Sequence, residues 1–215
     1  PPGERTAGEL TAELAFLRFL LNHDPPGVEP AQTPGIPEVV ECDGPIAHRG
    51  VLFRFMDGAP WRECEHDEEV IVAAGDALGR IHAGSRRLAE RGVSLPRRSW
   101  DQKPHLTRAV TLSARLDTRL PAAIERFFGE AAKLVPEPDR YGLIHGDFLF
   151  SNYLVTRDEP SIPTFSDTSV CVIDFDDCEY GWYAYDIAVN IYYYVLGGEP
   201  RGAERRTARA RELFE

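Results

Sequence analysis

The stretch from Gly142 to Ile173 constrains the fold most, because within it the helical spacing found elsewhere gives way to short β runs. These runs are Leu143–Ile144, Tyr153–Val155 and Val170–Ile173. Runs of this length, bounded by polar and turn-forming residues, predict strands. Since helical patterns lie on both sides, we predict an α+β fold in which a mainly helical unit carries short β-hairpins.

Amphipathic spacing predicts the helices. A Thr-Ala-Gly-Glu capping box opens a helix over residues 6–21, in which leucines recur at helical spacing. A long helix over 67–91 has acids at its start and arginines at its end. The helical region over 105–134 is broken or restarted near Pro121, because proline cannot join the hydrogen bonds of a preceding helix. The remaining predicted helices are Ala184–Leu196 and Gly202–Phe214.

The N-terminal part predicts one small β element. Residues 25–37 hold too many prolines for a helix or central strand and form a connector. Val39–Cys42 and Val51–Phe55 favour two antiparallel strands, separated by the turn residues Asp43-Gly44-Pro45. The Met-Asp-Gly-Ala-Pro sequence that follows is a natural boundary, so the chain divides into two predicted units, residues 1–56 and 57–215.

Charge and cysteine content exclude several functions. The chain has 24 Lys and Arg against 35 Asp and Glu, a net charge of -11, so its surface repels phosphate backbones and anionic lipids. We therefore expect no nucleic-acid or membrane partner. No apolar run approaches the roughly 20 residues of a membrane span, and no secretory signal opens the sequence. Four cysteines without a C-x-x-C pair favour reduced thiols, and we expect a cytoplasmic protein without structural zinc.

The residues that carry chemistry follow the predicted strands. Asp147 and Asn152 lie five positions apart on a turn after Leu143–Ile144, and Asp174 directly follows an apolar strand. Phosphoryl transfer needs a carboxylate near the attacking hydroxyl and oxygen ligands for a divalent metal. Aspartate and asparagine also cap turns, but their order along the chain favours a base and a metal site.

Three motifs resemble those of one superfamily. They are His145-Gly146-Asp147 with Asn152, then Ile173-Asp174-Phe175-Asp176-Asp177, and finally Tyr185-Asp186-Ile187-Ala188. In this order, over about 45 residues, they are similar to the aminoglycoside phosphotransferase and choline kinase superfamily, the small-molecule branch of the protein-kinase-like fold.

The resemblance implies a role for each residue. Asp147 would be the catalytic base or would orient the acceptor hydroxyl, and Asn152 and Asp174 would bind Mg²⁺. His145 would brace the loop rather than carry a proton. Asp186 would tie the catalytic loop to the following helix.

The resemblance also implies a nucleotide site. The segment around Met56-Asp57-Gly58 is similar to the linker between the two kinase lobes. There, the carbonyl of Arg54 and the amide of Met56 would hold the adenine of ATP, or the base of GTP.

Two family features are missing from the sequence. No glycine-rich hairpin precedes the first helix, and the only lysines, Lys103 and Lys133, lie too late to grip the nucleotide phosphates. Glu13 or Glu9 would be the partner of the missing lysine. We therefore expect a truncated N-terminal lobe, as in a fragment or shortened homologue of a longer kinase-like protein.

The leading functional prediction is transfer of the γ-phosphoryl group to a hydroxyl of a small molecule, such as an aminoglycoside or amino alcohol. The acidic cluster Glu63–Glu69 would attract a cationic acceptor, although acids there also complement the dipole of a helix start. The alternative is a non-catalytic kinase-like binding module or inactive fragment. A metal-dependent phosphoester hydrolase is the weakest alternative, because this region offers one histidine. The sequence does not indicate an oligomeric state.

Overall fold

The computed structural model describes residues 6–23, 27, 29–32, 38–42, 48–60, 68–102, 110–157 and 168–196. Its helices are α1 (Ala7–Leu21), α2 (Glu68–Glu90), α4 (Leu120–Ala131) and α5 (Tyr183–Leu196). Its strands are β1 (Val39–Cys42), β2 (His48–Val51), β3 (Ala59–Pro60), β4 (Tyr141–Ile144), β5 (Tyr153–Arg157), β6 (Thr168–Val172) and β7 (Glu179–Trp182). Short 3₁₀ turns are η2 (Trp100–Gln102), η3 (Phe150–Asn152) and η4 (Phe175–Asp177).

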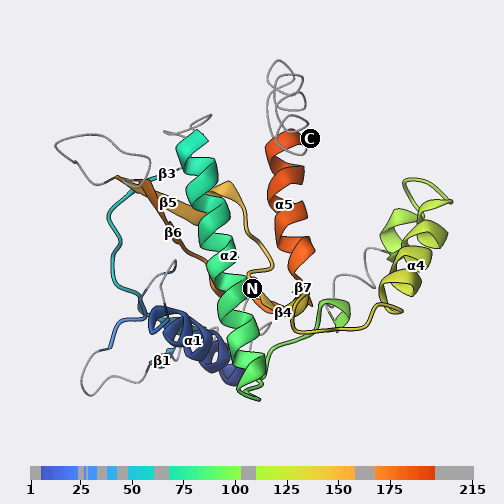
Figure 1. Cartoon of the computed structure of the whole chain (residues 1–215). Coiled ribbons are helices and arrows are strands. Elements are labelled where there is room, and N and C mark those ends of the chain that lie inside the picture. The colour runs from blue at the N-terminus through green and yellow to red at the C-terminus, as the bar shows by residue number, and fades with distance from the viewer. Residues whose placement is uncertain are drawn as a thin grey trace.

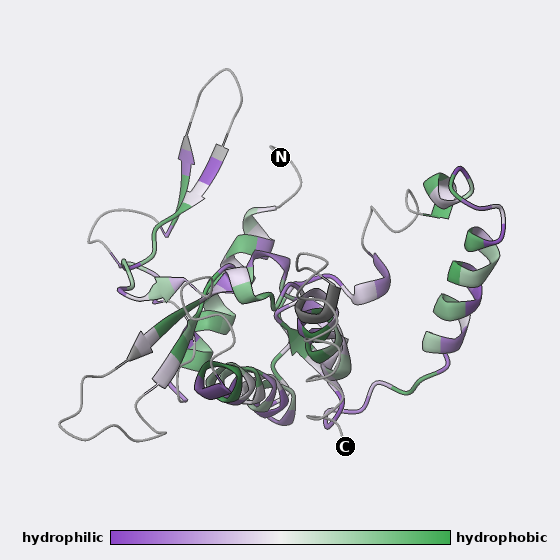
Figure 2. Ribbon diagram, turned by 90° about the horizontal axis from the view of Figure 1, so that it is seen from above, coloured by the Kyte–Doolittle hydropathy of each residue, from purple (hydrophilic) through white to green (hydrophobic). Residues whose placement is uncertain are grey.

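Helix α2 runs through the middle of the molecule (Figure 1). Helix α1 crosses it near one end, the β5–β6 hairpin covers one side, and α5 lies along the other. Helix α4 stands apart from these elements in both overall views (Figures 1 and 2). The mixture of helices and small sheets confirms the predicted α+β class, whereas the division at residue 56 stays a prediction.

The described strands form three small antiparallel sheets, ordered β1-β2, β3-β5-β6 and β4-β7. The strand predicted over 51–55 was wrong in its bounds, since β2 ends at Val51. Val51 pairs with Val39, the first residue of β1, so the ladder has no further partner there. Beyond it, Phe53 forms an isolated bridge with Pro30 of the proline-rich connector. Strand β7 was not predicted from the sequence.

The predicted starts of the helices α1 and α4 are confirmed. The capping box is present at the start of α1, where Thr6 and Glu9 bond reciprocally. Helix α4 begins at Leu120 with Pro121 in its first turn, which confirms the restart predicted there. The predicted turn Asp43–Pro45, helix Gly202–Phe214 and most of the acidic cluster Glu63–Glu69 lie outside the described residues.

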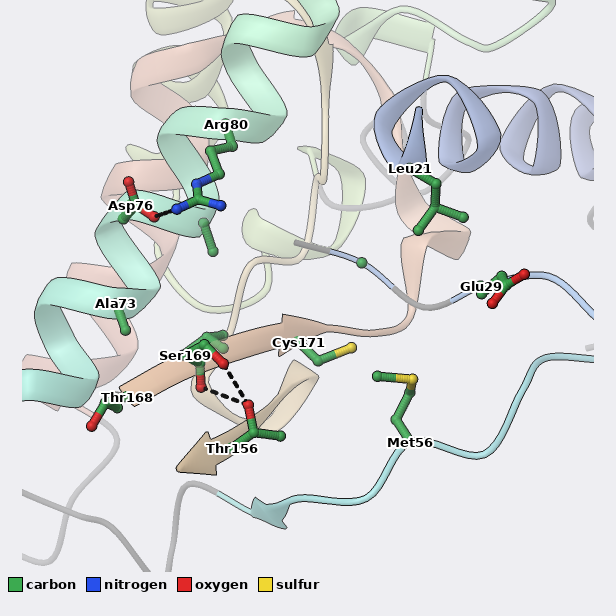
Figure 3. A pocket seen from close by; sticks show the side chains of 13 residues that line it. Leu21, Glu29, Met56, Ala73, Asp76, Arg80, Thr156, Thr168, Ser169 and Cys171 are labelled. Carbon is green, nitrogen blue, oxygen red and sulfur yellow. Dashed lines mark hydrogen bonds and ion pairs between the residues drawn. The ribbon is translucent and has the colours of Figure 1, made fainter. Parts of the chain in front are cut away.

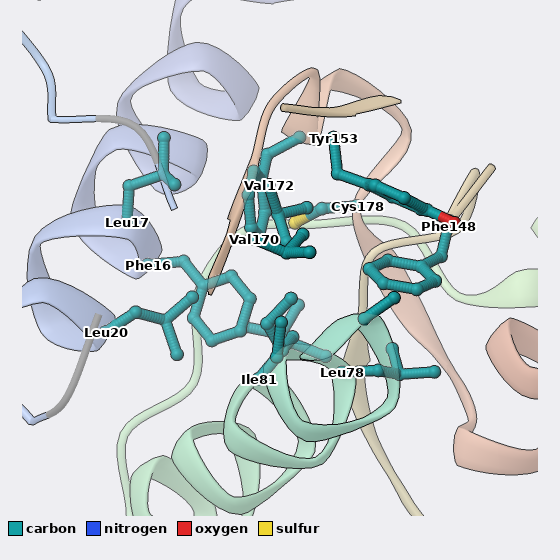
Figure 4. Packing of buried hydrophobic residues seen from close by; sticks show 14 of the residues in the cluster. Phe16, Leu17, Leu20, Leu78, Ile81, Phe148, Tyr153, Val170, Val172 and Cys178 are labelled. Carbon is teal, nitrogen blue, oxygen red and sulfur yellow. The ribbon is translucent and has the colours of Figure 1, made fainter. Parts of the chain in front are cut away.

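The core lies between α1, α2 and the β5–β6 hairpin (Figure 4). Phe16 and Leu20 of α1 point toward Ile81 of α2 (Figure 4). Leu17, Leu78, Val170 and Val172 belong to the same buried cluster. This packing holds β6 rigidly, because each of these side chains is almost completely buried. Residues that follow β6 are therefore placed on a fixed strand end.

Two cysteines belong to the buried part of the molecule. Cys171 and Cys178 are free thiols, as the cysteine spacing predicted. Burial raises the pKa of Cys171 to about 11 and that of Cys178 to about 12. Within the part of the chain that the structure describes, no helix is both long and apolar enough to cross a lipid bilayer.

Candidate active site

The predicted catalytic loop, residues 145–152, begins where β4 ends in the core. Gly146 in this loop has a φ of 83°, a backbone conformation that residues with a side chain rarely adopt. A Cβ at this position would lie 2.3 Å from the carbonyl oxygen of Asp177. The loop therefore packs directly against the Asp174 turn, residues 174–178, and glycine is required at the contact.

The structure brings Asp147 and Asn152 together. The side-chain amide of Asn152 donates to both the carbonyl oxygen and the carboxylate Oδ2 of Asp147, each at 2.9 Å. Asn152 is 9% exposed, and its own side-chain oxygen accepts a bond from Ser151 at 3.3 Å. The pair thus presents carboxylate and carboxamide oxygens from one short loop.

Asp174 lies on the adjacent strand end. The amide of Ile173 donates to the carbonyl of Asn152 at 2.8 Å, so the two loops are joined immediately before Asp174. Asp174 has a φ of 63° and is the sole non-glycine residue with a positive φ in the described ranges. It is exposed, whereas Phe175 beside it is buried against Phe16 of α1. Such backbone outliers concentrate at functional sites.

His145 holds the two loops together from inside. It is fully buried, and its Nε2 lies 3.0 Å from the carbonyl of Ile173, to which it donates. Its Nδ1 accepts from the amide of Asp147 at 3.3 Å, which requires the neutral Nε2–H tautomer. Burial lowers the pKa of His145 and so favours that neutral form. These contacts agree with the predicted bracing role.

Asp186 of α5 anchors the start of the catalytic loop. Its fully buried carboxylate accepts from the amides of His145 and Gly146, each at 2.8 Å. It also accepts from Nε2 of His82 on α2 at 3.0 Å. The predicted tie between loop and helix is present, and His82, whose side chain is 12% exposed, supplies a third donor to it.

Sequence reasoning missed Arg97. This buried residue, in the segment after α2, donates to the carbonyls of Asp176 and Cys178 in the Asp174 turn. No local pattern could have identified it, since an arginine after a helix commonly faces solvent. Of the two glutamates considered as partners of a lysine, Glu9 bonds Arg98 at 2.7 Å, and Glu13 lies 4.0 Å from Arg97.

The predicted adenine-binding residues, Arg54 and Met56, lie between β2 and β3, outside the catalytic loop and the Asp174 turn. Arg54 is exposed and pairs through its side chain with Glu29 at 3.0 Å. Met56 lines a cavity of about 400 Å³ between α2, the β5–β6 hairpin and the residues Gly27 and Glu29 (Figure 3). Its side chain points toward Cys171 of β6. The segment then continues into β3, which pairs with β5, the strand that follows Asn152.

The donor atoms suit a hard divalent cation. Asp147, Asn152 and Asp174 offer carboxylate and carboxamide oxygens, the ligands that Mg²⁺ and Ca²⁺ prefer. Among the described residues no three His, Cys, Asp or Glu side chains gather into a metal site, so a site here depends on the Asn152 oxygen. These oxygen donors fit a hard divalent cation, whose remaining ligands would come from phosphate and water.

Known proteins resemble the chain in sequence and structure. Amicoumacin kinase of Bacillus subtilis (strain 168) is 25% identical over 151 residues, 66% of this chain and 40% of that protein. The structure of amicoumacin kinase hAmiN in complex with AMP-PNP, Ca²⁺ and Ami matches with a TM-score of 0.69 and 18% identity over 94% of this chain and 59% of that one. A microcompartment-associated aminopropanol kinase matches with a TM-score of 0.59 and 25% identity over 94% of this chain and 63% of that one.

These likenesses confirm the protein-kinase-like fold. The chain spans 40% to 63% of the length of these relatives. A model of the phosphotransferase enzyme family matches residues 1–214, and the chain belongs to that family.

Proposed function

We propose that this chain carries the catalytic residues of a kinase that transfers the γ-phosphoryl group of a nucleoside triphosphate to a hydroxyl of a small molecule. The observation that carries the proposal is the hydrogen-bonded pair of Asp147 and Asn152, joined through Ile173 to the exposed, left-handed Asp174. Membership of the phosphotransferase family supports it.

In this proposal Asp147 accepts a hydrogen bond from the acceptor hydroxyl and aligns its oxygen for in-line attack. The Asn152 amide fixes the Asp147 carboxylate at 2.9 Å and leaves its own oxygen to serve as a ligand. Asn152 and Asp174 would hold Mg²⁺, which when bound neutralises charge on the phosphates. His145 keeps the loop in place and transfers no proton in the reaction.

For the nucleotide, we propose that the backbone of Arg54 and Met56 contacts the base. The position of Met56 at a cavity beside the β5–β6 hairpin supports this assignment. The AMP-PNP and Ca²⁺ in the hAmiN structure support a nucleotide and a divalent metal in a protein of the same fold. ATP or GTP would serve as the donor.

For the acceptor, we propose a small amino alcohol or a related amine-bearing molecule. One relative is a kinase of aminopropanol, which carries both an amine and a hydroxyl group. The net charge of -11 favours a cationic acceptor over an anionic one.

Transfer of ³²P from ATP or GTP to a panel of hydroxylated amines tests the proposal, with Asp147→Asn as the variant. We expect kcat to fall by about 10²- to 10⁴-fold while the melting temperature stays close to that of the wild type, because the new carboxamide still accepts from Asn152. Asp139→Asn, at an exposed turn before β4, is the control and should keep full activity. Near-normal turnover by Asp147→Asn would refute the assignment.

The second candidate function is a non-catalytic kinase-like binding module. Calorimetry with Mg²⁺ and AMP-PNP separates the two. Binding together with transfer supports the kinase, and binding without transfer to any acceptor supports the module.

A further inference from the structure

Arg97 is a buried cation that contacts two parts of the chain, the Asp174 turn and α1. Its side chain is 6% exposed. Its Nε donates to the carbonyl of Cys178 at 2.5 Å, and its Nη2 donates to the carbonyl of Asp176 at 2.6 Å. Its Nη1 donates to the carbonyl of Glu9 in α1 at 3.0 Å. One planar group thus joins the Asp174 turn to the first helix.

Because of its electrostatic environment, replacing Arg97 is expected to cost stability. A buried guanidinium requires compensation for the water it has lost, and here carbonyl oxygens and a nearby carboxylate supply it. The carboxylate is that of Glu13, which is also buried and lies 4.0 Å from Nη1. Lysine offers a single point charge and cannot reproduce a fork that reaches three carbonyls in different directions.

The Asp174 turn is held from two sides. On one side, Gly146 of the catalytic loop lies against the carbonyl of Asp177. On the other, Arg97 binds the carbonyls of the residues before and after Asp177. The backbone between the end of β6 at Val172 and the Arg97 contact at Asp176 is thus fixed at both ends. Asp174 lies in this short stretch.

We propose that Arg97 is a positioning residue, which sets the orientation of the Asp174 carboxylate by clamping the turn behind it to α1. The inference rests on the proposed function, in which Asp174 is a metal ligand. Arg97 does not touch substrate or metal. Groups that orient a ligand in this way typically change metal affinity by about 10- to 100-fold when they are replaced.

The test compares Arg97→Lys and Arg97→Met with Arg98→Met. Arg98 is the matched control, because it lies next in the chain and also bonds α1, through the Glu9 carboxylate. Mn²⁺ binding in the presence of AMP-PNP is followed by electron paramagnetic resonance, on samples whose circular dichroism matches the wild type. Hydrogen exchange of the amides of residues 174–178 is measured in parallel. If Arg97→Met does not fold, Arg97→Lys, which keeps the buried charge, carries the test.

We expect both Arg97 variants to bind Mn²⁺ about 10- to 100-fold more weakly and to exchange faster in the turn, while Arg98→Met resembles the wild type. Folded Arg97 variants with wild-type affinity and unchanged exchange would overturn the inference. If the wild type itself does not bind Mn²⁺, the proposed function fails, and the exchange data alone decide whether Arg97 holds the turn.

Discussion

Both ring nitrogens of His145 are engaged, one as a donor to the carbonyl of Ile173 and one as an acceptor from the amide of Asp147. A second proton would turn the acceptor into a donor that faces another donor. Because the ring is buried, its pKa lies below the usual value, although the nearby Asp186 carboxylate opposes the shift. The catalytic loop, residues 145–152, therefore keeps this conformation only while the His145 ring is neutral.

This arrangement predicts acid sensitivity. With a folded pKa below the unfolded value of about 6.5, the unfolded chain takes up the proton first as pH falls. The contribution of His145 to the free energy of unfolding is thus complete above about pH 6.5 and is lost as pH drops toward the lowered folded pKa. Urea denaturation between about pH 7.5 and pH 5 should show this decline.

His145→Gln provides the comparison. Its carboxamide keeps a donor for Ile173 but does not titrate, so we expect a less stable protein whose stability falls less steeply with acid. Equal slopes for the variant and the wild type would assign the acid sensitivity to other groups.

Local sequence patterns found residues whose partners are close in the chain, and the family resemblance added Asp186 and His145, whose partners are distant. Asp147 and Asn152 are five positions apart, so a loop motif suffices to place them together. His82 and Arg97 could not be recognised, because their partners Asp186 and Asp176 lie 104 and 79 positions away. Long-range polar contacts of this kind depend on the folded core, which a local pattern does not describe.

Among the elements, the same distinction separates helices from strands. Spacing within one segment predicted α1 and α2 closely, and a single proline predicted the start of α4. Strand β7 was missed, and β2 was misplaced. Their bounds depend on partners, β4 and β1 respectively, and pairing decides where a strand begins and ends.

The contact between α1 and α2 predicts opposite effects of one substitution at two positions. A Cβ on Gly84 of α2 would lie 2.4 Å from Cδ2 of the buried Leu20, whereas a Cβ on Gly75 meets nothing within 4 Å. Alanine favours a helix over glycine by about 0.5–1 kcal/mol, so Gly75→Ala should stabilise the protein by that amount. Gly84→Ala should instead destabilise it by about 1–2 kcal/mol through overpacking.

Chemical denaturation of both variants checks this pair. Since residue type and helix are the same, the difference isolates the packing of α1 on α2. Stabilisation by both substitutions would mean that α1 shifts to accept the added methyl group.

For the molecule as a whole, Asp186 connects elements that are distant in sequence. Its carboxylate joins α5 to the catalytic loop and to α2 through His82, whose ring also stacks on Tyr183 at 4.5 Å. Buried networks of this kind stabilise only when every member is satisfied. The loop therefore depends on the docking of both helices.

Asp186→Asn should reduce the free energy of unfolding by about 3–5 kcal/mol. The carboxylate accepts from three donors through two oxygens, whereas the carboxamide has one oxygen, and its NH₂ group would face another donor. A double-mutant cycle with His82→Gln should give a coupling of about 0.5–3 kcal/mol. Both quantities follow from denaturation curves of the single and double variants. Strictly additive effects would show that His82 and Asp186 act independently.

The left-handed backbone at Asp174 restricts how this site can change. Only glycine and asparagine share the tolerance of aspartate for such a φ, and both remove the negative charge. In the genetic code each of them is a single base change from aspartate. Under the proposed function, the substitutions at this position that best preserve the fold are therefore those that take one negative charge away from the metal site, which is a short route to a kinase-like protein that binds its cation more weakly.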